Sequence, residues 1–150
     1  MLRRGRKKFK FINMKLILYT DGGSRGNPGP AASGVVIKDE EGKIVRAFGS
    51  FLGKATNNFA EYTAVIESLK EARAFGADEV ECRMDSQLVV RQMTGQYKIK
   101  EPHIKDLAAQ VAKLATNFRS ISYIHIPREL NKEADAQVNL ALDKALGVKV

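Results

Sequence analysis

The chain is poor in cysteine and has no long apolar segment. Its one cysteine, Cys82, cannot form an internal disulfide, and its place in a predicted strand suits a small buried hydrophobic residue. No apolar run approaches the roughly 20 residues that span a bilayer, and no secretory signal follows the basic N-terminus. We therefore expect a cytoplasmic protein with no membrane segment.

Positive charge is concentrated at the N-terminus. The 150-residue chain has a net charge of +8, and removing the six cations of residues 1–13 leaves about +2. We expect residues 14–150 to form one domain and residues 1–13 to be a basic N-terminal extension. Two interpretations of the extension stay open: an arm that contacts phosphates, which Phe9 and Phe11 slightly favour, or a segment upstream of a start at Met14. The cations are Arg3, Arg4, Arg6, Lys7, Lys8 and Lys10.

The apolar pattern predicts an α/β fold. Five strands are expected, at Leu16–Thr20, Ala32–Lys38, Lys43–Phe51, Glu79–Met84 and Ser120–Ile126. Helical spacing and cap-type residues predict four helices, at 56–75, 86–93, 102–117 and from about 131 onward. The first three strands would form an antiparallel meander. The later strands alternate with helices, which predicts parallel additions to the sheet and helices on its faces.

Four carboxylates lie where these predicted elements begin or end. Asp21 follows the first strand, Glu61 lies near the start of the first helix, Asp85 follows the fourth strand, and Asp135 lies in the first turn of the last helix. Oxygen ligands delivered from four separate segments suit hard divalent cations. Two such cations can clamp an in-line phosphoryl displacement. The sequence therefore predicts a metal-dependent nuclease.

Each carboxylate also has an ordinary structural explanation. Asn58 and Glu61 have the spacing of a capping box, which on its own favours capping over catalysis. Asp21 would initiate a turn, Asp85 would cap a helix, and Asp135 would favour the helix dipole. Each signal is weak singly, but the four together, each with distinctive neighbours, favour one shared site.

Those neighbours resemble the type 1 ribonuclease H family. The resemblance runs from about Met14 to about Leu146, in matching order and spacing. It is carried by Asp21-Gly22-Gly23-Ser24-Arg25-Gly26-Asn27-Pro28-Gly29, Thr56-Asn57-Asn58-Phe59-Ala60-Glu61, Asp85-Ser86-Gln87 and Asn131-Lys132-Glu133-Ala134-Asp135. It implies a ribonuclease H-like fold, a five-stranded mixed sheet with helices on both faces. It also implies an endonuclease that hydrolyses the RNA strand of RNA/DNA hybrids, leaving 5′-phosphate and 3′-hydroxyl ends.

The resemblance implies a metal site at the four carboxylates. Asp21, Glu61, Asp85 and Asp135 would hold two Mg²⁺ ions, with Mn²⁺ as a substitute. Asp21 would bridge the ions, Asp135 would serve the ion that activates water, and Glu61 and Asp85 would serve the ion that stabilises the leaving oxygen. Four negative side chains in one small site need cations to offset them.

The resemblance also implies six substrate-binding residues. Some would sense the 2′-hydroxyl, a donor and acceptor that DNA lacks, and others would hold phosphates. The minor-groove candidates are Ser24, Gly26, Asn57 and Gln87, and the phosphate candidates are Asn27 and Thr56. Turn and cap chemistry is an alternative explanation of Asn27 and Thr56.

The chain departs from the family pattern in two places. Many members have a histidine in the loop before the last carboxylate, whereas this loop has Arg128, and His125 is expected to be a structural histidine in a strand. Arg128 would steer the scissile phosphate or the product, but a guanidinium cannot act as a general base. The second departure is the short link Gln96–Lys100, where many relatives have a longer basic helix and loop.

These departures leave other functions open. One alternative is a nuclease of the same fold with another substrate, such as double-stranded RNA, because without the longer basic element discrimination between duplex types could be looser. A binding module with an inactive site, or a fragment of a larger reverse transcriptase, are further alternatives. The presence of all four carboxylates argues against an inactive site. The chain begins before its first strand and ends with its last helix, so we expect a free-standing enzyme, and a monomer is the default for the family.

Overall fold

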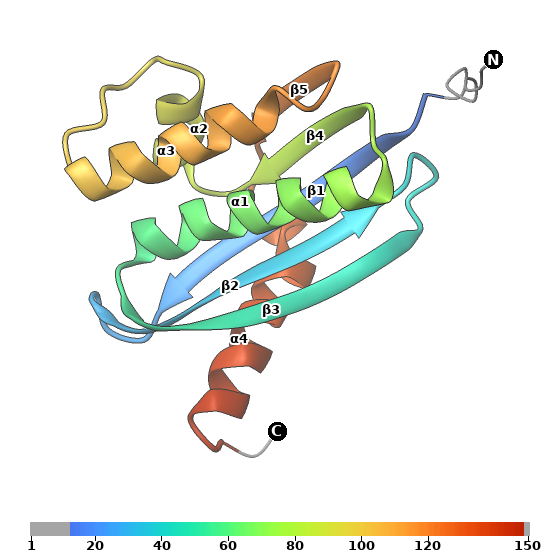
Figure 1. Ribbon diagram of the computed structural model, residues 1–150. Helices are drawn as coiled ribbons and strands as arrows, with labels where there is room; N and C mark the ends of the chain where they lie inside the picture. The colour runs from blue at the N-terminus through green and yellow to red at the C-terminus, as the bar shows by residue number, and fades with distance from the viewer. Residues whose placement is uncertain (1–12, 149–150) are drawn as a thin grey trace.

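The computed structural model describes residues 13–148, and most of the basic segment 1–13 therefore lies outside the described residues. Strands and helices alternate as predicted (Figure 1). The strands are β1 (Lys15–Ser24), β2 (Gly29–Lys38), β3 (Ile44–Ala55), β4 (Glu79–Met84) and β5 (Ser120–His125). The helices are α1 (Asn57–Phe75), α2 (Gln87–Met93), α3 (Pro102–Ala115) and α4 (Lys132–Ala145), with a 3-10 turn at Arg128–Leu130.

The five strands form one mixed sheet in the order β3-β2-β1-β4-β5. β1 pairs antiparallel with β2, and β2 pairs antiparallel with β3, so the predicted meander is confirmed. β4 pairs parallel with β1 on its other side, and β5 pairs parallel with β4. The helical crossovers make these parallel pairings possible, because parallel neighbours cannot be joined by a hairpin.

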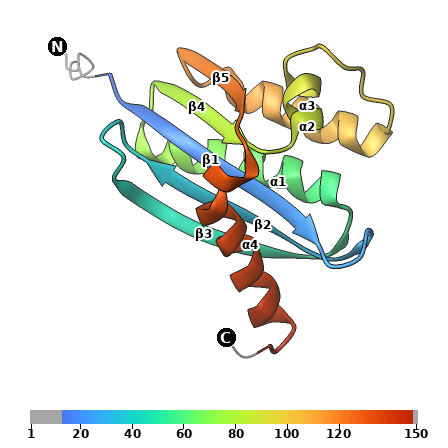
Figure 2. The same cartoon turned by 180° about the vertical axis from the view of Figure 1, so that it is seen from behind.

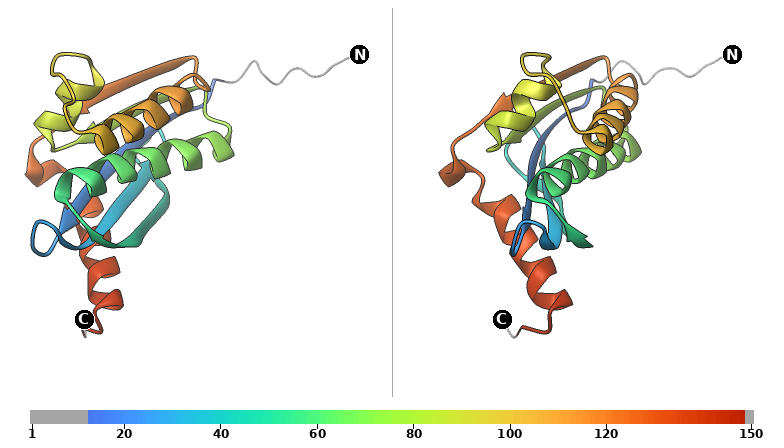
Figure 3. Two further views of the ribbon diagram at one scale, coloured as in Figure 1. Left: turned by 60° about the vertical axis from the view of Figure 1, so that its left-hand side comes forward. Right: turned by 90° about the vertical axis from the view of Figure 1, so that its left-hand side faces the viewer.

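One face of the sheet carries the main core, under α1 and α3 (Figure 1). Alternation along β1 directs Leu16 and Leu18 to this face, where Tyr62 and Leu69 of α1 meet them. Val111 of α3 packs in the same cluster. The edge-on views show these helices on one side of the sheet and α4 on the other (Figure 3). Helices on both faces are therefore confirmed.

The other face is crossed by α4, which lies over β1, β2 and β3 (Figure 2). Gly34 and Gly49 make this close approach possible. A Cβ atom on Gly34 would collide with the carbonyl oxygen of Ala134, and one on Gly49 would collide with that of Gln137. At these two positions the backbone of α4 lies directly against β2 and β3, and Ala32, Val138 and Leu142 form a small buried cluster between helix and sheet. Leu146 follows the last turn of α4 and is exposed.

The first three strands are longer than predicted. The first strand was expected to end at Thr20 and the second to begin at Ala32, but β1 continues to Ser24, β2 begins at Gly29, and only residues 25–28 turn. Ser24 pairs with Ala31 in the sheet, and this long-range pairing outweighs the local turn preference of the glycines. Within residues 13–148, no helix has the length and apolar character needed to cross a membrane.

Candidate active site

Three carboxylates from distant segments meet at one edge of the sheet. Asp21 lies on β1, Glu61 on α1, and Asp85 directly after β4, and one ligand oxygen of each lies within 4.8 Å of the others. The parallel pairing of β1 with β4 ends at Thr20 opposite Met84. The next residues of the two strands are Asp21 and Asp85, so the register of the sheet places them side by side.

Gly22 brings Glu61 into this group. A Cβ atom on Gly22 would collide with the backbone of Ala60 and the amide nitrogen of Glu61. Only glycine leaves enough space for α1 to approach β1 this closely. The backbone N–H of Gly22 also donates to the carboxylates of Asp21 and Glu61. Gly22 therefore sets the separation of these two carboxylates.

Asp135, the fourth predicted carboxylate, lies beside the group in the first turn of α4. Its side chain shares a hydrogen bond with Asp21. The helix start is fixed by the buried Asn131, whose Nδ2 donates to the carbonyl oxygen of Thr20 at 2.8 Å. One hydrogen bond thus ties the first turn of α4 to the residue preceding Asp21.

The capping explanations of Glu61 and Asp85 are excluded. Thr56 is the N-cap of α1 and accepts from the N–H of Phe59 at 3.1 Å, which leaves Glu61 beyond the first turn. Ser86 caps α2 and accepts from the N–H of Val89 at 3.2 Å. Both carboxylates are therefore available to a ligand. Asp21 starts no turn, because it lies within β1 and not at its end, where we had expected it.

Burial and mutual repulsion disfavour ionisation of this site. Burial, then the charge of Asp85, then a hydrogen bond from Asp135 raise the pKa of Asp21 from 3.8 to about 8. Burial, followed by the charges of Asp21 and Asp85, also raises the pKa of Glu61 well above its ordinary value, and the positive charge of Arg128 opposes this. A bound cation would reverse this balance, because it stabilises the ionised carboxylates. The oxygen-only ligand set of the three-carboxylate group fits a hard divalent cation.

The carboxylates open into a cavity of about 440 Å³. Of the other predicted site residues, Ser24, Asn57 and Arg128 line it. Gly26, Asn27, Thr56 and Gln87 are not among its lining residues; Gly26 and Asn27 lie in the 25–28 turn, Thr56 caps α1, and Gln87 begins α2. The complete lining is Asp21, Gly22, Gly23, Ser24, Arg25, Asn57, Glu61, Asp85, Arg128, Asp135, Val138, Asn139 and Leu142.

Polar side chains link the turn to the start of α1. The Oδ1 atom of Asn57 accepts from the N–H of Ser24 at 2.8 Å and from its hydroxyl at 3.1 Å. The Oδ1 atom of Asn27 accepts from the N–H of Asn57 at 3.0 Å. Asn27 and Thr56 thus supply the turn and cap bonds that we had considered for them, and they hold Asn57 at the cavity.

Sequence reasoning missed two lining residues, Arg25 and Asn139. Arg25 forms an ion pair with Asp143 at 2.7 Å, and its guanidinium approaches the Oδ1 atom of Asn139 at 3.4 Å. The spacing of Asp135, Asn139 and Asp143, four residues apart on one helix face, was the signal that could have found them. His125, expected to be a structural histidine, is exposed at the end of β5 and does not line the cavity.

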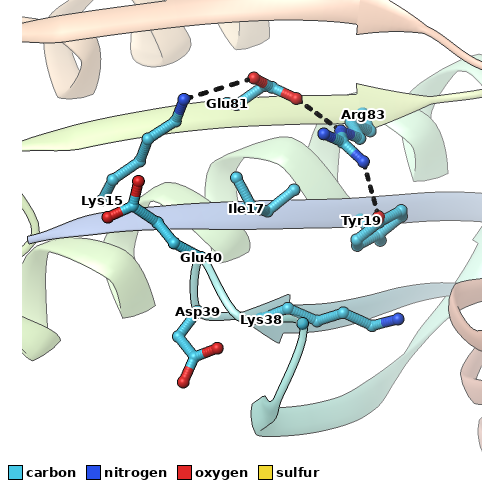
Figure 4. Close-up of a pocket in the computed structure, with 9 residues that line it drawn as sticks. Lys15, Ile17, Tyr19, Lys38, Asp39, Glu40, Glu81 and Arg83 are labelled. Carbon is cyan, nitrogen blue, oxygen red and sulfur yellow. Dashed lines mark hydrogen bonds and ion pairs between the residues drawn. The ribbon is translucent and has the colours of Figure 1, made fainter.

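A second hollow, of about 290 Å³, lies on the sheet surface away from this site (Figure 4). Three of its charged side chains bind one another. Glu81 pairs with Lys15 at 3.7 Å and with Arg83 at 2.5 Å, and Arg83 donates to the hydroxyl of Tyr19 at 2.8 Å. Because these bonds already satisfy Lys15, Glu81 and Arg83, we assign no chemistry to this hollow.

The strand order and the acidic edge define a ribonuclease H-like protein, and comparison with known proteins agrees. The family model described as "Reverse transcriptase-like" matches residues 19–141. Ribonuclease HI of Halobacterium salinarum is 47% identical over 127 residues, covering 85% of this chain and 64% of that protein. The solved structure of LC11-RNase H1 in complex with RNA/DNA hybrid is 50% identical, with a TM-score of 0.83, covering 87% of this chain and 99% of that one.

The chain therefore belongs to the type 1 ribonuclease H family. It spans less than two thirds of the length of several curated relatives that it matches. A bifunctional protein of Mycobacterium tuberculosis, 45% identical over 133 residues, is matched over 36% of its length and 88% of this chain.

Proposed function

We propose that this protein is an endoribonuclease that hydrolyses the RNA strand of RNA/DNA hybrids and leaves 5′-phosphate and 3′-hydroxyl ends. The observation that carries the proposal is the group formed by Asp21, Glu61 and Asp85, with Asp135 bonded to Asp21 beside it. Family membership supplies the substrate class. We infer that residues 14–150 are the catalytic domain and residues 1–13 a basic extension.

The four carboxylates would hold Mg²⁺, two ions per site, with Mn²⁺ as a substitute. Bound there, the cations supply the charge that stabilises an in-line phosphoryl displacement. Asp21 interacts with both Asp85 and Asp135, so we assign it the role of serving both ions. The protein itself contributes the fixed positions of these oxygens and the burial that excludes bulk water.

Arg128 would bind the non-reacting oxygens of the scissile phosphate or of the product. It lines the cavity, and its positive charge acts on Glu61. A guanidinium suits this role because its planar fork matches phosphate oxygens. Proton transfer would fall to solvent, since no histidine is among the lining residues of the described cavity.

Ser24 and Asn57 would recognise the RNA strand. The hydroxyl of Ser24 donates its proton to Asn57, which leaves its own oxygen as an acceptor. Asn57 uses its Oδ1 for Ser24, which leaves its Nδ2 hydrogens as donors. A 2′-hydroxyl both donates and accepts, so it can bond to the Ser24 oxygen and to the Asn57 amide nitrogen. Gly26 and Gln87 would complete the minor-groove surface, with Asn27 and Thr56 near the phosphates.

The test is cleavage of one labelled RNA strand, offered in an RNA/DNA hybrid, in double-stranded RNA and alone, with and without Mg²⁺. We expect metal-dependent cutting of the hybrid that Asp21→Asn abolishes. Asp106→Asn, an exposed change on α3, is the matched control and should cut normally. Binding without cutting in every metal condition would contradict the proposal and leave a nucleic-acid-binding module.

Double-stranded RNA is the second candidate substrate. The observation in its favour is the short connection from Met93, where α2 ends, to Pro102, where α3 begins. No basic helix lies within this described connection to select between duplex types. Equal cutting of both duplexes in the same assay would widen the function to both. We further infer a monomer and a cytoplasmic location, which gel filtration and cell fractionation would test.

A further inference from the structure

The exposed polar face of α4 contains a bonded row of side chains that begins at the active site. Asp135, Asn139 and Asp143 lie four residues apart and therefore on one face of the helix. The Nδ2 atom of Asn139 donates to the carbonyl oxygen of Asp135 at 3.2 Å and approaches its carboxylate Oδ2 at 3.4 Å. Arg25 reaches this row from the turn between β1 and β2.

The hydrogen-bond donors and acceptors in this row determine which way the side-chain amide of Asn139 points. A guanidinium only donates hydrogen bonds, so Arg25 must face the amide oxygen, at 3.4 Å. A carboxylate and a carbonyl only accept, so Asp135 must face the amide nitrogen. In the opposite orientation the amide nitrogen would face the donors of Arg25, and the amide oxygen would face the acceptors of Asp135. Arg25 therefore selects the rotamer in which Asn139 donates to Asp135.

Arg25 is itself held in place from two sides. Asp143 pairs with its guanidinium at 2.7 Å, and both side chains are partly buried, with 38% and 22% of their side-chain surface exposed. Its backbone N–H donates to the carbonyl oxygen of Pro30 at 2.8 Å, which closes the turn. The preceding residue, Ser24, is bonded to Asn57 at the start of α1. One turn thus joins the start of α1 to the middle of α4.

We propose that Asn139 is a positioning residue for Asp135, and that Arg25, anchored by Asp143, holds the amide of Asn139 in its donating orientation. Only the kinetic consequence of this inference rests on the proposed function. With the amide in place, the carboxylate of Asp135 is restrained beside Asp21 on the cavity side of α4. Without it, rotation of the Asp135 side chain toward solvent becomes easier.

The test is the full-length Asn139→Ala variant. Alanine is the better helix former, so the melting temperature should stay equal or rise. We expect kcat on the hybrid to fall about tenfold with KM within twofold, because the variant no longer places a reacting group. Calorimetric titration with Mn²⁺ alone, which needs no substrate, should show severalfold weaker binding. Asn139→Gln keeps the amide donor and should recover part of both effects.

The matched control is Asn117→Ala, which removes another exposed asparagine that bonds to a carbonyl oxygen, that of Leu114, far from the site. It should behave as the native protein. An Asn139→Ala variant with native kcat, or with native Mn²⁺ affinity, would overturn the inference. If native protein cuts no hybrid, the proposed function fails, but the Mn²⁺ titration still decides whether Asn139 positions Asp135.

Discussion

At the scale of single residues, Asp21 dominates the electrostatics of the site. It is buried, with 7% of its surface exposed, and its neighbours include Asp85 and Asp135. Its carboxylate is stable in the folded protein either with a proton or beside a cation. Protons and divalent cations should therefore compete for the same oxygens.

The stability of the metal-free protein should depend on the charge of Asp21. The pKa of Asp21 is about 8 in the folded protein and 3.8 ordinarily, so between these values the folded state binds more protons than the unfolded chain. The free energy of unfolding therefore falls as pH rises through this window. In EDTA, Asp21→Asn should melt about 5 °C above native protein at pH 8, on the order of 2 kcal/mol.

The same comparison at lower pH supplies the control. Near pH 4 the native carboxyl is protonated and resembles the amide, so the two melting temperatures should converge. Adding Mg²⁺ at pH 8 should raise the melting temperature of the native protein more than that of the variant. A constant difference from pH 4 to pH 8 would contradict the raised pKa of Asp21.

Arg128 offers a second prediction at this scale. Its positive charge, after the backbone hydrogen bond of Gly22, acts to lower the pKa of Glu61, and it lines the cavity. Arg128→Ala should lower kcat/KM for the hybrid about tenfold, as expected when one charge-assisted bond to phosphate is removed. Arg128→Lys should retain part of the rate, because it keeps the charge without the fork. Steady-state kinetics measure both, and native rates in Arg128→Ala would exclude the role.

At the scale of elements, the contact of α4 with the sheet decides where Asp135 lies. Gly34→Ala would place a methyl group against the carbonyl oxygen of Ala134, in the first turn of α4. The helix must lift away, and we expect a loss of about 2 kcal/mol in the free energy of unfolding. Because the collision is next to Asp135, activity should fall severely even where the variant is fully folded. Chemical denaturation and hybrid cleavage measure the two effects.

Gly42→Ala is the matched control for this change. Gly42 lies in the hairpin between β2 and β3 at a φ of 85°, and a Cβ atom there meets nothing within 4 Å. The substitution should cost roughly 1 kcal/mol through backbone strain alone and leave cleavage intact. If both alanine variants lose activity equally, the fit of α4 to the sheet is not what positions Asp135.

The sequence predicted the helices and strands better than it predicted the contacts between them. The bounds of β4, Glu79–Met84, agree with the prediction because apolar and polar residues alternate throughout it. The four carboxylates were predicted from their neighbours, and all four line one cavity, three of them with ligand oxygens within 4.8 Å of one another. The extension of β1 to Ser24 was missed, since it depends on pairing with β2, which the local glycine pattern does not show. The hydrogen bond from Arg25 to Asn139 joins residues 114 positions apart, so no local pattern could predict it.

At the scale of the whole molecule, the uneven charge suggests how substrate is held. Residues 1–13 carry six cations, which exceeds the net positive charge of the rest of the chain. Deleting them should weaken hybrid binding and flatten its dependence on salt. For every phosphate that the shortened protein no longer neutralises, the slope of log K against log salt should become about 0.9 less steep. Fluorescence anisotropy with a labelled hybrid, in EDTA to prevent cutting, measures this.

Two further variants separate the possible causes. Replacing the six cations with glutamine should reproduce the change in slope, whereas Phe9→Ala with Phe11→Ala should leave the slope unchanged. Equal affinity and slope in the deletion and the native protein would indicate that the segment does not contact substrate. The kcat at saturating hybrid should not change in either case, because the carboxylates that line the cavity lie outside residues 1–13.

The close fit of α4 to the glycines beneath it also indicates that the protein could be divided into two fragments. Gly34 and Gly49 allow the backbone of α4 to lie against β2 and β3, and this helix carries Asp135. Residues 1–126 alone would lack a catalytic carboxylate, and a synthetic peptide of residues 127–150 would supply it. Mixing the two fragments should restore cleavage in proportion to their association. The chain would then act as a two-part reporter, in which activity appears only where the two parts are brought together.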